Sequence, residues 1–332
     1  MKLIIHTEQE TTELHDLYGL FFEDINHAAD GGLYAELVQN RSFEFCPIDN
    51  EAYHGLTAWE KIENGGKVEL TVREGDAVSE KNPHYLEISV TEAGDAGVRN
   101  LGFNGGIPLR KDAAYDFTCY ARRRDQTVTH LAVSLRGADG QSYQEKTFVL
   151  TENWEKYEIT FTSPVDDCTA CLAVTVGGTG RADLDFVSLF PQDTYKRRRN
   201  GLRRDLAEAL EAMHPKFLRF PGGCLIHTGS LNAEDRDSMY RWKNSVGPVE
   251  HRPARRNSWG YNQTLGLGYY EYFQFCEDLG AKPLPVLPGG YDPHHGWAAE
   301  GEQLQEFIQD ALDLIEFANG APDTEWGAKR AG

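Results

Sequence analysis

The chain has 332 residues and a formal net charge of −19 at pH 7, with 33 Lys and Arg residues against 52 Asp and Glu residues. An acidic surface repels nucleic acid and anionic membranes, which makes both unfavourable partners. Hydrophobic residues make up 40% of the chain and charged residues 26%, a typical globular composition that excludes wholesale disorder. At about 150 residues per domain, this length favours two domains.

The start of the chain gives no sign of export. No apolar run approaches the roughly 18 residues of a membrane-spanning helix, and His6 and Glu8 end the short, largely apolar stretch at residues 1–5. Six cysteines are too few for a disulfide scaffold in a chain of this length. We therefore expect a cytoplasmic protein with reduced thiols and no membrane partner.

The first segment, residues 1–49, holds one short strand, expected at 18–22, and a dense block of apolar and charged residues at 19–45. The second segment, residues 50–191, has apolar residues at every second position of several short runs, separated by Gly, Asp and Asn. This alternation predicts an antiparallel β-sandwich. The runs include Val68, Leu70, Val72; Leu86, Ile88, Val90; Tyr115, Phe117, Cys119; Leu131, Val133, Leu135; and Tyr157, Ile159, Phe161.

The third segment, residues 192–332, changes to a helical period. Helices are expected at about 202–213, 272–279 and 304–315, and short buried strands at 216–220 and 283–287. Alternating strands and helices predict βα units around a parallel sheet. We expect an α/β plus all-β protein, in which the first three βα units of a (β/α)8 TIM barrel carry an inserted antiparallel β-sandwich. A complete barrel needs roughly 250 residues, so this one is expected to stop before strand four.

Polar residues follow each expected strand of the barrel. The three strand ends contain Glu23, Arg219 and Asp292, and two of them are closed by Pro-Gly-Gly turns. Active sites of β/α barrels lie at these ends, and carboxylate and guanidinium groups bind polyhydroxylated ligands. The alternative is that Glu23 and Arg219 only form a buried ion pair.

Three stretches, residues 19–45, 200–224 and 240–287, closely resemble glycoside hydrolase family 51, whose main activity is α-L-arabinofuranosidase. The resemblance implies a retaining mechanism, in which one glutamic acid protonates the leaving oxygen and a second glutamate forms a covalent glycosyl-enzyme. In that family both glutamates come from strand four and later strands. We therefore expect no catalytic residue in this chain, which resembles the N-terminal portion of such an enzyme. The inserted sandwich resembles the jelly-roll, carbohydrate-binding-module-like domain that many bacterial members carry at the same place.

The same resemblance implies substrate-binding roles for four residues. Glu23 matches a glutamate that binds the arabinofuranose hydroxyls, and Arg219 matches an arginine that braces the pocket wall. Cys224 lines that pocket, and Trp259 lies near the aglycone side. The implied partner is an arabinose-containing oligosaccharide or polysaccharide, and a homo-oligomer is common among such enzymes.

Other features suggest little further chemistry. A single Cys168-x-x-Cys171 motif lacks the second pair that a zinc site usually needs, and a solvated loop is the simpler interpretation of Asp292, His294 and His295. No cofactor or metal site is expected, apart from an alternative structural calcium at Asp183 and Asp185. Two rival functions are a non-catalytic carbohydrate-binding protein and a related barrel glycosidase that acts on xylosides or glucans.

Overall fold

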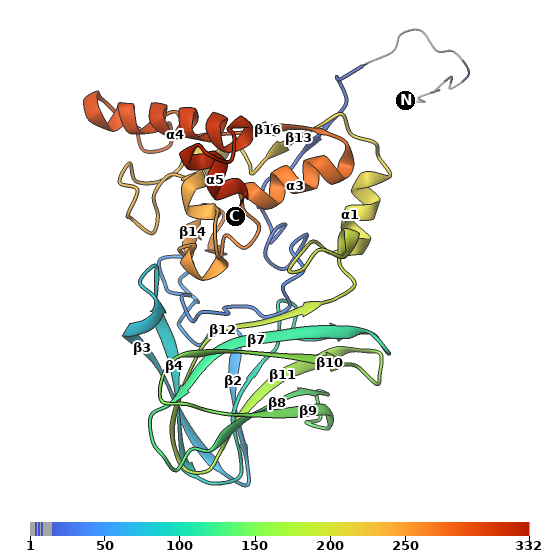
Figure 1. Ribbon diagram of the computed structural model, residues 1–332, viewed down its shortest axis with the longest axis vertical. Coiled ribbons are helices and arrows are strands. Elements are labelled where there is room, and N and C mark those ends of the chain that lie inside the picture. The colour runs from blue at the N-terminus through green and yellow to red at the C-terminus, as the bar shows by residue number, and fades with distance from the viewer. Residues whose placement is uncertain (1–3, 5, 7, 9–14, 332) are drawn as a thin grey trace.

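The computed structural model describes residues 4, 6, 8 and 15–331, and it consists mostly of β-structure (Figure 1). A sandwich occupies the lower part of the view, and a smaller part with parallel strands and helices lies above it. The six cysteines, all within the described residues, are unpaired, as expected. Among the described residues, no helix has the length and apolarity that crossing a membrane requires.

The sandwich consists of two antiparallel sheets, as the alternation predicts. One sheet has the order β10-β7-β12-β4-β3 and the other β2-β5-β11-β8-β9, with β6 paired to β11. Its strands are β2 Trp59–Asn64, β3 Lys67–Ser79, β4 Asn82–Glu92, β5 Asp95–Asn100, β6 Ile107–Leu109, β7 Ala114–Arg123, β8 His130–Arg136, β9 Ser142–Val149, β10 Glu155–Thr162, β11 Asp167–Gly177 and β12 Gly180–Pro191.

The core of the sandwich is made by the residues that alternate inward. Leu86, Ile88 and Phe117 are fully buried, and the polar residues between them face the other way, as a period of two requires. The core also takes side chains from outside the sandwich strands, because Val38 and Phe43 of the preceding block pack into it.

The upper part is built on a parallel sheet with the order β1-β13-β16. The strands are β1 Leu20–Phe21, β13 Phe217–Phe220 and β16 Lys282–Pro285, and the helices that alternate with them are α1 Arg204–Glu211, α3 Tyr269–Leu279 and α4 Gly301–Asn319. Gly280 ends α3 in the left-handed conformation, with φ of 65°, which glycine adopts without a steric penalty. All five expected elements of residues 192–332 are therefore confirmed.

Several short elements were not expected. They are the 3₁₀ turns η1 Tyr195–Arg197, η2 Trp242–Ser245 and η3 Val249–His251, the helices α2 Cys224–His227 and α5 Glu325–Ala331, and the hairpins β14 Arg255–Asn257 with β15 Tyr261–Gln263 and β17 Tyr291–Asp292 with β18 Trp297–Ala298. Each is too short to show a hydrophobic period of its own.

Candidate functional site

The three parallel strands bring their carboxyl ends to one edge of the sheet. Phe21 is paired with Arg219 in the register of β1 and β13, and Arg219 is paired with Leu284 of β16. The pairing continues past the strand ends, because the amide of Asp24 donates to the carbonyl of Pro221 at 3.1 Å. The segments that follow the strands therefore lie next to one another, as barrel-like topology leads one to expect.

Glu23 is half-buried and is held by the backbone of the Pro-Gly-Gly turn. Its Oε1 accepts hydrogen bonds from the amides of Gly223 at 2.8 Å and Leu225 at 3.4 Å. A Cβ at Gly222 would lie 2.8 Å from Cγ of Glu23, which is too close for a real contact. Glycine at position 222 is therefore what allows the Glu23 side chain to lie against this turn.

Arg219 lies beside Glu23 but is not paired with it. Its guanidinium carbon is 4.5 Å from the centre of the Phe21 ring, a cation–π contact. Among the described residues, the Glu23 carboxylate bonds to the backbone amides of the turn and not to Arg219. The structure therefore does not contain the buried Glu23–Arg219 ion pair that was the alternative interpretation. Both groups remain able to hydrogen-bond a ligand.

A cavity of about 430 Å³ opens at this edge of the sheet. It brings two of the four expected substrate-binding residues together, Arg219 and Cys224, while Glu23 and Trp259 are not among the residues that line it. The lining residues are Arg219, Gly223, Cys224, Ile226, His227, Val286, Leu287, Gly289, Tyr291 and Pro293.

Trp259 lies at the turn of the β14–β15 hairpin, with an exposed side chain. The hairpin is attached to the end of β1: Asn257 Nδ2 and the Tyr261 hydroxyl both donate to the carbonyl of Asp24, at 2.9 and 2.7 Å. The amide of Trp259 donates to Asn257 Oδ1 at 2.7 Å. The hairpin is therefore fixed one residue away from Glu23.

Asp24 is the residue that sequence reasoning missed. Its carboxylate is buried and accepts hydrogen bonds from the Tyr261 hydroxyl, Gln263 Nε2 and the amide of Ala29, at 2.8, 2.6 and 3.0 Å. Burial raises its pKa to about 6, and the nearby Asp30 adds to the rise. The acidic residue at the end of the first strand was visible in the sequence. Its side-chain partners Tyr261 and Gln263, however, lie more than 230 residues away along the chain.

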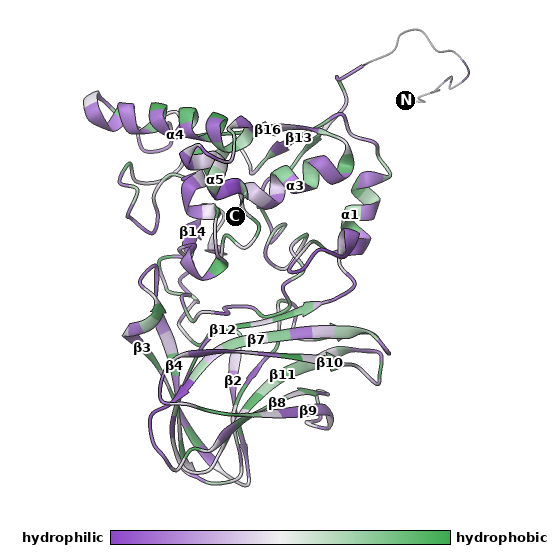
Figure 2. Cartoon of the chain, in the orientation of Figure 1, coloured by the Kyte–Doolittle hydropathy of each residue, from purple (hydrophilic) through white to green (hydrophobic). Residues whose placement is uncertain are grey.

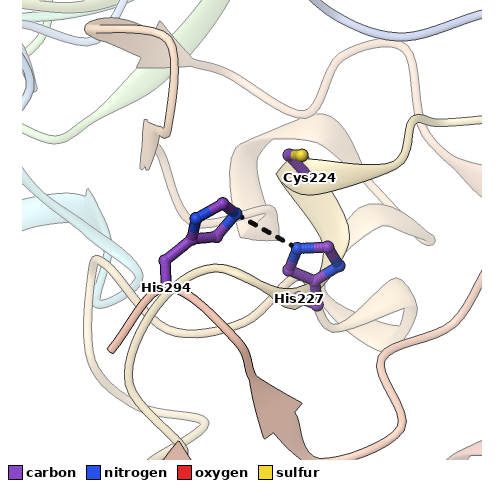
Figure 3. Close-up of side chains that lie close together, drawn as sticks. All are labelled: Cys224, His227 and His294. Atoms are coloured by element: carbon purple, nitrogen blue, oxygen red, sulfur yellow. Dashed lines mark hydrogen bonds between the residues drawn. The ribbon is translucent and has the colours of Figure 1, made fainter. Parts of the chain in front are cut away.

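The second cluster at this edge is formed by Cys224, His227 and His294 (Figure 3). Of the three loop residues considered together in the sequence, Asp292 and His295 pair with each other, because His295 Nδ1 lies 2.7 Å from Asp292 Oδ2. His294 instead points toward His227 of α2.

The two acidic residues considered for calcium have different surroundings. Arg122 Nε donates to Asp183 Oδ2 at 2.7 Å, and a guanidinium this close opposes a cation electrostatically. Asp185 is fully buried, and burial raises its pKa well above the usual value.

An Asn-Glu dipeptide, the feature that precedes the acid/base in the resembled family, occurs at Asn50-Glu51. It lies in a turn before β2 and does not follow a parallel strand. Asn50 Nδ2 donates to the carbonyl of Gly260 at 2.8 Å, and Glu51 is exposed. Its place in the chain does not match that of a barrel acid/base.

Both parts of the chain are similar to known protein families. Residues 209–332 match the family model of the alpha-L-arabinofuranosidase 1 domain, and residues 35–183 match that of a carbohydrate binding domain. An extracellular exo-alpha-L-arabinofuranosidase of Streptomyces chartreusis is 47% identical over 95% of this chain and 38% of its own length. Alpha-L-arabinofuranosidase 1 of Arabidopsis thaliana is 33% identical over 95% of this chain and 46% of its own.

A solved structure agrees with the sequence comparisons. The arabinose-bound α-L-arabinofuranosidase MgGH51 superposes with a TM-score of 0.85 and 34% identity, over 96% of this chain and 51% of that one. The chain thus spans about 38% to 51% of the length of these relatives.

One expectation is overturned by these comparisons. We expected a cytoplasmic protein, whereas the Streptomyces relative is an extracellular enzyme, which contradicts that expectation. The apolar start at residues 1–5, from which the cytoplasmic location was argued, lies mostly outside the described residues. The expected resemblance itself is confirmed: the chain is homologous to the α-L-arabinofuranosidases of glycoside hydrolase family 51.

Proposed function

We propose that this chain is part of an α-L-arabinofuranosidase and forms one side of its sugar pocket. The observation that carries the proposal is the 47% identity to the Streptomyces enzyme over 95% of the chain. The substrate is a terminal, non-reducing α-L-arabinofuranosyl residue of an oligosaccharide or polysaccharide. Since the chain spans only 38% of that relative, the activity belongs to the whole protein.

The strand order supports the first three βα units of a (β/α)8 barrel. β1, β13 and β16 are parallel neighbours in chain order. At the open side, Leu284 of β16 is 49% exposed, although the strands of a complete β/α barrel are buried on both faces. Further βα units of the whole protein would pair with this edge and cover it.

In this pocket Glu23 is the residue that recognises the sugar hydroxyls. Its Oε1 is held by the amide of Gly223 at 2.8 Å, which fixes the carboxylate and directs Oε2 to accept a hydrogen bond from the ligand. A hydrogen bond to a charged group is worth about 1.5–3 kcal/mol. Arg219 and Cys224 form the wall of the adjoining cavity, and the exposed Trp259 offers an aromatic face to the leaving group.

The chemistry is retaining hydrolysis. A proton donor and a nucleophilic carboxylate, about 5–5.5 Å apart, cleave the glycosidic bond through a covalent glycosyl-enzyme. We assign both carboxylates to the remainder of the whole protein. The described residues contribute orientation: they hold the arabinofuranose so that its anomeric carbon meets that pair.

Hydrolysis of an aryl α-L-arabinofuranoside by the whole protein tests this proposal. We expect turnover of the arabinofuranoside well above that of the matching aryl xyloside, and no turnover by the 332-residue chain alone. Glu23→Gln should lower kcat/KM about tenfold to a hundredfold, whereas the exposed Glu80→Gln should leave it unchanged. A preference for the xyloside, or turnover by the 332-residue chain, would reject the proposal.

The sandwich suggests a structural or substrate-orienting role more than tight glycan binding. Residues 35–183 match a carbohydrate binding domain, and Trp59, Tyr85 and Phe103 are the aromatic residues first considered as a binding platform. Trp59 and Tyr85 are buried, and Trp59 Nε1 donates to the carbonyl of Asn40 at 2.9 Å. Titration of the whole protein with arabinan oligosaccharides, comparing the wild type with Phe103→Ala, tests whether the half-buried Phe103 contributes to binding.

We also infer that the whole protein acts outside the cell, as the Streptomyces relative does. A polysaccharide substrate is too large to enter a cell intact. Activity measured separately in the culture medium and in the cell extract of the source organism tests this inference, and activity confined to the extract would contradict it.

A further inference from the structure

Three side chains with metal-binding atoms converge beside the strand-end cavity. One ligand atom each from Cys224, His227 and His294 lies within 4.8 Å of the other two. The Nε2 atoms of His227 and His294 are 3.4 Å apart, and Figure 3 shows the two rings directed toward each other with the Cys224 sulfur beside them. Cys224 and His227 are half-buried, and His294 is exposed.

The local fold explains why these residues meet. Cys224 and His227 are the first and last residues of α2, and a spacing of three residues places both on the same face of a helix. His294 comes from the turn between β17 and β18. Asp292 joins the two segments, because its carboxylate accepts from the amide of Gly229, just after α2, at 3.0 Å and from the amide of His294 at 2.8 Å.

The separations suit a tetrahedral ion. Zinc binds imidazole nitrogen at about 2.0–2.1 Å, which places two nitrogens on one tetrahedral ion about 3.3 Å apart. The two Nε2 atoms, at 3.4 Å, already have this separation. The thiolate of a zinc site lies about 3.6 Å from each nitrogen by the same geometry, so Cys224 needs at most a shift of about 1 Å.

We propose that Cys224, His227 and His294 form a binding site for Zn²⁺ or a similar divalent ion of the late first transition series. Thiolate and imidazole are the ligands that such ions prefer, whereas Ca²⁺ and Mg²⁺ prefer oxygen. Three protein ligands leave one coordination position, and since Cys224 and His227 line the 430 Å³ cavity, that position opens toward it.

The proposal does not depend on the proposed glycosidase activity, because metal binding is measured directly on the 332-residue chain. Titration with Zn²⁺ in competition with a chromophoric chelator should give one bound ion per chain. Titration with Co²⁺ should give the intense visible bands of a tetrahedral site, together with a near-ultraviolet thiolate-to-cobalt charge-transfer band.

Two variants and two controls identify the ligands. His294→Ala changes an exposed side chain, so it should fold normally and weaken Zn²⁺ binding at least tenfold. Cys224→Ser should remove the charge-transfer band. The controls are Cys168→Ser, an exposed thiol of the sandwich, and His251→Ala, an exposed imidazole, and both should bind as the wild type does.

The proposal is overturned by any of three results: less than one ion bound per chain at micromolar Zn²⁺, an unchanged cobalt spectrum in Cys224→Ser, or unchanged affinity in His294→Ala. If Cys224→Ser does not fold, the affinity of His294→Ala still decides the question.

Discussion

At the scale of single residues, two adjacent glycines should respond differently to the same change. A Cβ at Gly222 would lie 2.8 Å from Glu23 Cγ, whereas one at Gly223 would meet its nearest neighbour at 3.8 Å. In the whole protein, Gly222→Ala should therefore displace Glu23, lower kcat/KM for an aryl arabinofuranoside more than tenfold, and lower the free energy of unfolding by about 1–3 kcal/mol.

Gly223→Ala is the matched control for this prediction. It keeps the amide that donates to Glu23, and its new methyl group has ordinary van der Waals room. Steady-state kinetics and urea unfolding of both variants provide the comparison. Equal losses in the two variants would mean that the turn, and not the position of Glu23, controls activity.

Asp24 should make stability depend on pH. Its pKa is raised from 3.8 to about 6 in the folded protein, so between about pH 4 and 6 the folded state holds a proton that the unfolded chain has released. The stability contributed by this carboxyl is therefore greatest at low pH and falls as the pH rises through that window. The full effect is at most about 3 kcal/mol, given about 1.4 kcal/mol per pKa unit.

Asp24→Asn isolates this effect, because an amide does not titrate. The difference between wild-type and Asp24→Asn free energies of unfolding should move in favour of the variant as the pH rises from 4 to 7. Asp323→Asn, at an exposed position, should show no such change. If the difference in free energy of unfolding between the wild type and Asp24→Asn were the same at pH 4 and pH 7, the carboxyl would be ionised throughout.

At the scale of elements, the sequence predicts what is periodic and misses what depends on distant partners. The alternation at Leu86 and Ile88 located β4, and the helical period of residues 304–315 located α4. By contrast, nothing near Asp24 in the sequence indicates Tyr261 or Gln263 as its partners. The α2 helix was missed for a different reason, since four residues cannot show a period.

Periodicity also located helix α4 without saying which of its faces is covered. Leu304, Ile308, Leu312 and Ile315 are 37% to 61% exposed, although their spacing of three and four residues is that of a buried face. The apolar residues that α4 buries are Phe307, Leu314 and Phe317, and Asp310 is buried with them. Figure 2 shows apolar and polar residues alternating along its ribbon.

The exposed stripe should make the 332-residue chain self-associate. Ile315→Lys, at a position 61% exposed, should reduce association in size-exclusion chromatography with light scattering and leave the thermal midpoint unchanged. The neighbouring Leu314→Ala, at a position 4% exposed, should instead lower the free energy of unfolding by about 2–5 kcal/mol. Association that persists in Ile315→Lys would place the contact surface elsewhere.

At the scale of the whole molecule, the block before the sandwich joins the two parts. Ser188 of β12 donates to Glu36 Oε2 at 2.6 Å, and the amide of Leu189 donates to Glu36 Oε1 at 2.9 Å. Arg236 of the upper part pairs with Asp49 at 2.6 Å. Residues 36–49 thus contact both the sandwich and the βα units, which pattern analysis of either part alone does not reveal.

This arrangement bears on where an independent sandwich would begin. The expected boundary at residue 50 leaves out Val38 and Phe43, which are 2% and 1% exposed in the sandwich core. It also leaves out the carbonyl of Asn40, which accepts from Trp59 Nε1 at 2.9 Å. The sandwich has about 140 residues from residue 50 onward, which is enough for autonomous folding if its core is complete.

We therefore expect residues 35–191 to fold cooperatively on their own, and residues 50–191 to be less stable by at least about 3 kcal/mol, the usual cost of losing one large buried side chain. Circular dichroism during urea unfolding measures both fragments. Phe43→Ala in the longer fragment is the control, because it removes the core side chain but keeps the backbone of the block. If Phe43→Ala loses about as much stability as the shorter fragment does, the difference between the fragments comes from core packing. If both fragments and the variant are equally stable, residues 35–49 serve only to attach the sandwich to the βα units.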